Sequence, residues 1–320
     1  MKTFTAKPQR FSARLSALFA VALFTYQIGK SNVSTQISLS SQPTLLLKNL
    51  QLVESPRWHD GQLWFSDWMA QELRTVDLTG NSELISKVSS FPFCFDWLPD
   101  GQLLVVSGRE AKLLRMKTDG TLAPHIDLSG LSTHPWNEIV VDGRGNTYIN
   151  NSGFNFPQAE FAPGFIVLVR PDGSVEQVAD GVAFPNGMVV TPDNSTLILA
   201  ESYGNCLTAF DIAADGTLSN RRVWAHCEGD HPDGICMDAE GAIWYADVGN
   251  KRCVRVREGG EVLQTVEVDR GCFACMLGGA DGKTLFVLAN DWRGPASMGD
   301  SAGTGQVLTV EVNVPHAGWP

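Results

Sequence analysis

The chain has 320 residues, of which 43% are hydrophobic, only 18% are charged and 31 are glycine. Few charges together with many glycines favour an all-β protein over a helical one. The formal net charge of −11 argues against nucleic acid as a partner. The acidic charge is confined to the later part of the chain, because residues 1–53 contain six Lys or Arg and no Asp or Glu.

We assign residues 1–42 to an N-terminal extension and exclude them from the fold. Four basic residues up to Arg14 precede an apolar run from Leu15 to Thr25, which is typical of a signal peptide, although no small-x-small cleavage site follows. A transit peptide and an unstructured extension are the alternatives. A cytoplasmic location is favoured for the folded domain. If the extension is a cleaved targeting segment, the domain would instead be secreted or imported into an organelle. The run is shorter than the ~20 apolar residues that span a bilayer, so we expect no membrane-spanning segment.

One pattern recurs six times along the rest of the chain: an apolar run, a turn of the Asp-Gly type, and a second apolar run. The copies are centred on residues 59–65, 99–105, 142–149, 192–199, 238–245 and 280–287. Their spacing of about 40 to 50 residues is typical of the blades of a β-propeller.

A second series of six alternating strands follows the first, one strand after each copy. These strands occupy residues 73–77, 113–117, 165–169, 207–211, 253–256 and 307–310. Two matching series predict an all-β fold, a six-bladed β-propeller formed by a single domain over residues 43–320. Residues 43–50 are expected to supply the outer strand that closes the last blade.

The innermost strands of a propeller line its central channel, so residues at their starts converge. We predict inner strands that start near residues 54, 94, 137, 186, 233 and 274. Four of them present an oxygen-bearing side chain at the equivalent position: Glu54, Asn137, Asn186 and Asp233. Two carboxylates and two amides are costly to bury unpaired, and a divalent cation would offset that cost. Oxygen ligands indicate Ca²⁺, Mg²⁺ or Mn²⁺; a water-filled polar channel is the alternative.

Four short motifs carry a resemblance to a known family. They read Glu-Ser-Pro-Arg-Trp at 54–58, Asn-Glu-Ile-Val-Val-Asp at 137–142, Phe-Pro-Asn-Gly-Met at 184–188 and Pro-Asp-Gly-Ile-Cys at 232–236. Over residues 50 to 312 the chain resembles the senescence-marker-protein/gluconolactonase, or regucalcin-like, family of six-bladed propellers. The resemblance implies metal ligation by Glu54, Asn186 and Asp233, with Asp233 also acting as general base. It implies that Asn137 binds substrate close to the metal.

The resemblance further implies hydrolysis of sugar-acid lactones with Ca²⁺ as the first expectation, Zn²⁺, Mg²⁺ or Mn²⁺ being alternatives. One position departs from the family pattern, because Pro135 stands where sugar lactonases often carry an arginine. We therefore place His134 and Trp136, which flank it, among the candidate substrate-binding residues and consider a less polar lactone. His134 and His231 could equally be structural or solvated, and Trp136, with Phe154 and Phe156, could equally belong to the core between blades.

The chemistry is consistent with these residue types. A divalent cation polarises a lactone carbonyl and stabilises the developing oxyanion, while a carboxylate takes a proton from water. No GxSxG motif supports a serine nucleophile. The alternatives are a non-catalytic calcium-binding or partner-binding propeller, a phosphotriesterase-like hydrolase and a strictosidine-synthase-like propeller. The expected partner is a small lactone, while its identity, the native metal and the oligomeric state stay open.

Seven cysteines are scattered between positions 94 and 275, and Cys272 and Cys275 have the CxxC spacing. A second such pair is missing, so we predict that both are buried free thiols. A zinc-binding or redox pair is the alternative.

Overall fold

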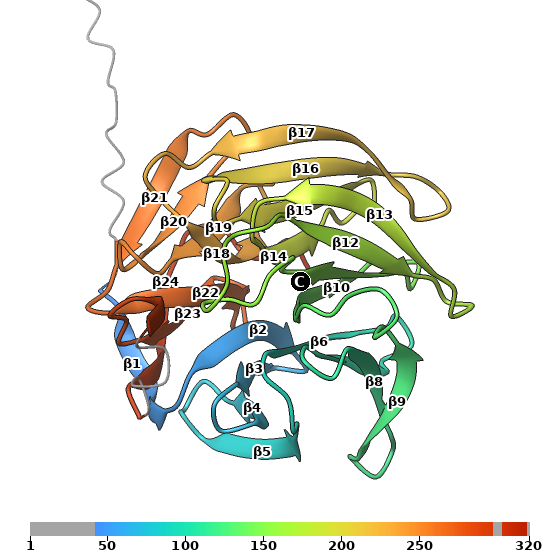
Figure 1. Ribbon diagram of the computed structural model, residues 1–320. Helices are drawn as coiled ribbons and strands as arrows, with labels where there is room; N and C mark the ends of the chain where they lie inside the picture. The colour runs from blue at the N-terminus through green and yellow to red at the C-terminus, as the bar shows by residue number, and fades with distance from the viewer. Residues whose placement is uncertain (1–41, 297–302, 319–320) are drawn as a thin grey trace, which may run out of the picture. The chain divides into compact units, whose positions relative to one another are not determined.

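The computed structural model describes residues 42–296 and 303–318, which form 24 strands in six four-stranded antiparallel sheets. The sheets are arranged around a common centre as the blades of a β-propeller (Figure 1). The prediction of a six-bladed all-β propeller is confirmed. Within the described residues, no helix is long and apolar enough to cross a membrane.

Each of the first five blades consists of four consecutive strands, ordered from the innermost to the outermost. The first three blades are β2 (Val53–His59), β3 (Gln62–Asp67), β4 (Glu72–Val76) and β5 (Ser82–Lys87); β6 (Phe93–Trp97), β7 (Leu103–Ser107), β8 (Lys112–Met116) and β9 (Leu122–Asp127); and β10 (Trp136–Val141), β11 (Thr147–Asn151), β12 (Gly164–Val169) and β13 (Val175–Val182). The next two are β14 (Pro185–Val190), β15 (Thr196–Glu201), β16 (Cys206–Ile212) and β17 (Leu218–His226); and β18 (Pro232–Met237), β19 (Ile243–Asp247), β20 (Arg252–Val256) and β21 (Val262–Glu267).

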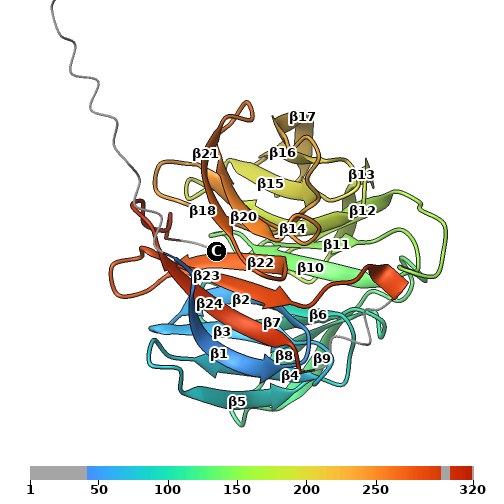
Figure 2. The same ribbon diagram turned by 90° about the vertical axis from the view of Figure 1, so that its left-hand side faces the viewer.

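The sixth blade joins the two ends of the domain. It contains β22 (Gly271–Gly278), β23 (Thr284–Asn290), β24 (Gly305–Glu311) and, as its outer strand, β1 (Thr44–Leu50). Strand β1 pairs antiparallel with β24, and Figure 2 shows the two side by side. The prediction that residues 43–50 close the last blade is confirmed.

The repeated Asp-Gly turns explain why the blades form where they do. In the turn between β6 and β7, the carboxylate of Asp100 accepts a hydrogen bond from the backbone amide of Gln102 at 3.0 Å, and Gly101 has a φ of 83°. The turn between β10 and β11 uses Asp142 in the same way, accepting the amide of Asn146 at 2.9 Å. A short carboxylate that binds the local backbone, followed by glycine at positive φ, closes a tight hairpin.

The six inner strands lie around the channel, and each contacts its neighbours. They begin at Val53, Phe93, Trp136, Pro185, Pro232 and Gly271, within three residues of every predicted start. Apolar faces of adjacent blades pack between them, as where Trp58 stacks on Phe286 with ring centroids 5.3 Å apart. All seven cysteines are buried free thiols, so the prediction for Cys272 and Cys275 is confirmed.

Candidate active site

Four inner strands place the predicted donors at matching positions. Glu54, Asn137, Asn186 and Asp233 are the second residues of β2, β10, β14 and β18. In each strand the pairing with the next strand is interrupted just there, by a register shift that starts at or one residue before the donor. Such bulges redirect side chains next to functional sites. Here they occur at the end of the channel where the inner strands begin.

All four donors line one cavity of about 340 Å³. A cavity of this size is at the lower end of the range for small-ligand sites, which is roughly 300–1,000 Å³. The cavity floor is formed by these inner-strand residues. Its walls come from connections between strands at the same end of the blades and from Phe273 of β22.

The two carboxylates of the floor lie close together, Glu54 buried and Asp233 half-buried. Burial is the main cause that raises the pKa of Glu54 well above its ordinary value, and the nearby charge of Asp233 adds to it. Burial likewise raises the pKa of Asp233, with Glu138 as the second cause. Among the described residues, Asp233 Oδ1 is buried and has no hydrogen-bond partner. A buried carboxylate oxygen left unpaired is costly, so this atom is one that a bound cation would stabilise.

The two amides complete the floor. Asn137 Nδ2 lies 3.3 Å from Asn186 Oδ1 and 3.4 Å from the carbonyl oxygen of Pro185. Asn186 Nδ2 in turn donates to Ser202 Oγ at 3.4 Å. Because the NH₂ groups bind protein acceptors, Asn137 Oδ1 is left without a donor in the described part of the chain. Its oxygen is therefore available to a cation or a substrate.

The donor set fits a hard divalent cation. The described residues contain no group of three or more His, Cys, Asp or Glu side chains that could hold a metal by themselves. Any cation at the floor would therefore need amide oxygens beside the carboxylates of Glu54 and Asp233. Two carboxylates and neutral oxygens are the ligands that Ca²⁺ and Mg²⁺ take in proteins. The unpaired Asp233 Oδ1 is the atom that such a cation would satisfy.

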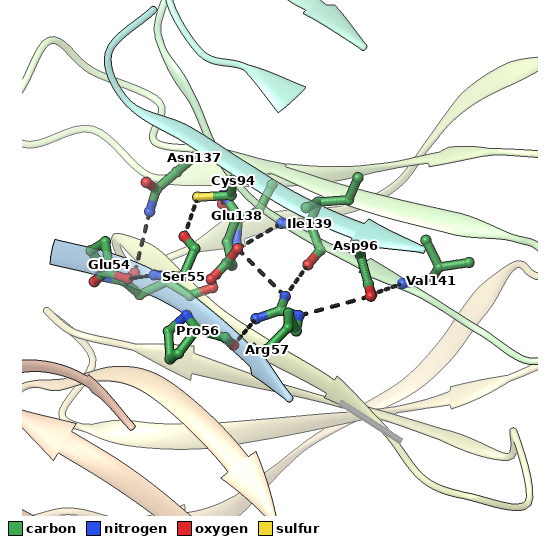
Figure 3. A network of polar contacts seen from close by, with 12 residues as sticks. Glu54, Ser55, Pro56, Arg57, Cys94, Asp96, Asn137, Glu138, Ile139 and Val141 are labelled. Atoms are coloured by element: carbon green, nitrogen blue, oxygen red, sulfur yellow. Dashed lines mark hydrogen bonds and ion pairs between the residues drawn. The ribbon is translucent and has the colours of Figure 1, made fainter. Parts of the chain in front are cut away.

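A buried ionic network lies beside the floor, and the sequence analysis did not identify it (Figure 3). Arg57 donates from Nη2 to the carbonyl oxygen of Ile139 at 2.8 Å and from Nη1 to that of Pro56 at 3.0 Å. Its guanidinium also lies 3.8 Å from Asp96 and 3.7 Å from Glu138. Arg57 and Glu138 both lie in the short family motifs, but no pattern in the sequence shows that they meet.

The residues that flank Pro135 do not reach the cavity. Pro135 itself lines it, whereas Trp136 is fully buried and packs edge-on against Phe165 at 5.5 Å. His134 is not among the lining residues. Successive strand residues face opposite sides, so Asn137 faces the channel while Trp136 faces the buried core. Of the other aromatic and histidine candidates, Phe156 and His231 line the cavity and Phe154 does not.

The fold and the donor set define a six-bladed propeller with a candidate cation site at one end of its channel. A family model described as the SMP-30/Gluconolactonase/LRE-like region matches residues 52–290, so the chain belongs to this family.

Individual relatives extend the comparison. A 6-deoxy-6-sulfogluconolactonase of Pseudomonas putida is 24% identical over 278 residues, which are 84% of this chain and 94% of that protein. A diisopropyl-fluorophosphatase of Loligo vulgaris is 28% identical over 202 residues, which are 57% of this chain and 64% of that protein. A solved structure of a calcium-binding protein, regucalcin, from Agrobacterium tumefaciens has a TM-score of 0.73 at 21% identity, covers 88% of this chain and 97% of that chain, and shows the same fold.

Proposed function

We propose that the chain is a divalent-metal-dependent lactonase, with Ca²⁺ as the expected cation and Glu54, Asn186 and Asp233 as its protein ligands. The observation that carries this proposal is the buried, unpaired Asp233 Oδ1 in a cavity that also contains Glu54 and two amides. Membership of a family whose relatives include a sugar-acid lactonase supports the reaction class.

The side chains divide the work of hydrolysis. When bound, the cation would supply positive charge to polarise the lactone carbonyl and stabilise the oxyanion. Asn137 orients the substrate through its amide, since its oxygen lies free beside the ligand set. Asp233 takes the proton from the attacking water through the carboxylate oxygen that does not bind the cation.

The test combines metal exchange with a matched pair of variants. EDTA-treated protein should regain lactonase activity with one of Ca²⁺, Mg²⁺, Mn²⁺ or Zn²⁺. Asp233→Asn keeps a ligand oxygen but cannot accept the proton, so kcat should fall by about 10²–10⁴-fold while the metal stays bound. Asp281→Asn, in the exposed turn between β22 and β23, is the control and should change neither kcat nor the bound metal. Full activity in Asp233→Asn would show that Asp233 is not the base.

A second activity is supported by the diisopropyl-fluorophosphatase relative. A cation held by the same three ligands could polarise a phosphoryl oxygen in place of a carbonyl oxygen. Diisopropyl fluorophosphate therefore belongs in the same assay. Turnover of this compound without turnover of any lactone would favour the phosphotriesterase-like alternative. Cation binding without either activity would favour a calcium-binding module.

A further inference from the structure

The walls of the cavity are predominantly aromatic. Seven rings from connections and strand ends of five blades line it, and we call them the aromatic collar: Trp68, Phe91, Phe156, Phe184, Tyr203, Phe273 and Trp292. They surround the space directly above the Glu54, Asn137, Asn186 and Asp233 floor. A substrate whose carbonyl reaches the floor must therefore place the rest of its body against these rings.

The collar is held in place by the backbone and by contacts between rings. Phe184 has a φ of 57°, in the left-handed region that bulky side chains rarely adopt. It precedes Asn186 by two residues, and its ring centroid lies 5.0 Å from that of Phe156 and 4.7 Å from that of Tyr203. Trp292 meets Phe273 edge-on at 5.6 Å. The strained backbone at Phe184 places an aromatic ring next to the proposed metal ligand Asn186, which indicates that this ring has a role in binding.

Polar side chains in the walls have little capacity left for a ligand. Ser152 Oγ donates to the carbonyl oxygen of Phe154 at 2.8 Å, and Ser202 Oγ donates to that of Pro232 at 2.7 Å. His231 Nδ1 lies 2.9 Å from the carbonyl oxygen of Ser202. Pro135 has neither a side-chain donor nor a backbone N–H. The other polar groups of the walls are the Tyr203 hydroxyl, His231 Nε2 and the Arg109 guanidinium, and apolar residues outnumber them. A polyhydroxylated sugar lactone would thus lose more hydrogen bonds to water at these walls than it gains from them.

One positively charged side chain, that of Arg109, lies at the edge of the collar. The guanidinium of exposed Arg109 lies over the ring of Phe91, 5.3 Å from its centroid. This contact covers one face of the Phe91 ring, and Arg109 lines the cavity from its exposed side. The apolar surface between rim and floor is therefore the part of the cavity that a substrate body meets.

We infer that the site selects lactones with an apolar alkyl or aryl substituent and discriminates against polyhydroxylated sugar-acid lactones. This inference rests on the proposed function for the reaction, and on the aromatic collar for the substrate. Each apolar group that enters the collar leaves water and gains contacts. Each hydroxyl that enters it loses its hydrogen bonds to water.

The first test compares two substrates on the full-length chain supplied with Ca²⁺. We expect kcat/KM for δ-decalactone to exceed that for glucono-δ-lactone by about tenfold or more, measured by proton release with a pH indicator. Calorimetry with the lactam analogue of each lactone measures binding without turnover. Preferred binding of the alkyl lactam with no hydrolysis of either lactone would refute the proposed function and support the apolar pocket. Equal or tighter binding of the sugar lactam would overturn the inference, whatever the hydrolysis shows.

A matched pair of variants then tests the collar itself. Phe184→Asn keeps a residue that tolerates the left-handed backbone and replaces the ring with a polar amide. We expect its kcat/KM for δ-decalactone to fall about tenfold, while that for glucono-δ-lactone stays or rises. Phe161→Asn is the control, because it changes an exposed ring that contacts Tyr203 but does not line the cavity. It should leave kcat/KM for both lactones unchanged. Equal losses on both substrates in Phe184→Asn would refute a selective role for the collar.

Discussion

Replacement of Arg57 by methionine tests the buried network beside the site. Methionine keeps an unbranched apolar stem but removes the charge and all donors. The Arg57 side chain is 7% exposed, and its guanidinium makes two hydrogen bonds to backbone carbonyls. Its removal leaves Asp96 and Glu138 buried without a cation, because no other basic group is paired with either in the described chain.

The size of the effect follows from these contacts. Loss of one partner of a buried ion pair costs about 3–5 kcal/mol, and the lost backbone hydrogen bonds are part of the same change. For a domain of this size, we expect the melting temperature to fall by on the order of 10 °C.

The stability deficit should also depend on pH. Burial raises the pKa of Asp96 to about 6 even with Arg57 lowering it, so the pKa rises further in the variant. A carboxyl with a raised folded-state pKa loses stability as pH rises through that value. The deficit relative to wild type should therefore be larger at about pH 8 than at about pH 5.

Urea unfolding at both pH values measures the deficit. A matched variant that combines Arg57→Met with Asp96→Asn and Glu138→Gln removes all three charges. It should recover much of the lost stability and show little of the pH dependence. A deficit below about 1 kcal/mol at high pH, or one that does not shrink on acidification, would refute the reasoning.

Three further outcomes are expected. Glu54→Gln should weaken Ca²⁺ binding by at least about tenfold in calorimetry, because it removes one of two ligand charges, whereas Glu83→Gln on the exposed part of β5 should not; equal affinities would place the cation elsewhere. Gly234→Ala should destabilise the fold by about 1–3 kcal/mol in urea, since its Cβ would lie 2.4 Å from that of Ala274, and an unchanged midpoint would contradict the close packing of β18 and β22. Ellman's reagent should find seven thiols in unfolded protein and almost none in native protein; a disulfide between Cys272 and Cys275 would contradict the fold.

Local sequence determined the blades and the set of candidate ligands. In the turns after β6 and β10, an aspartate accepts hydrogen bonds from local backbone amides and a glycine follows at positive φ, so these repeats could be recognised without tertiary information. The equivalence of Glu54, Asn137, Asn186 and Asp233 followed from counting back from these turns. Strands of similar length starting from similar turns bring equivalent residues to the same end of the channel.

Tertiary structure decided which side chains face the cavity and how charges are balanced beside it. Trp136 and Asn137 are adjacent, yet one is buried against Phe165 and the other lines the cavity, because strand residues alternate and a bulge intervenes. Arg57 meets Glu138 across 81 positions of the chain only because β2 and β10 lie around one channel. The aromatic collar arises from connections of five blades, and ring directions there depend on contacts such as that of Phe184 with Tyr203. Contacts between blades are non-local, so no periodicity along the chain encodes them.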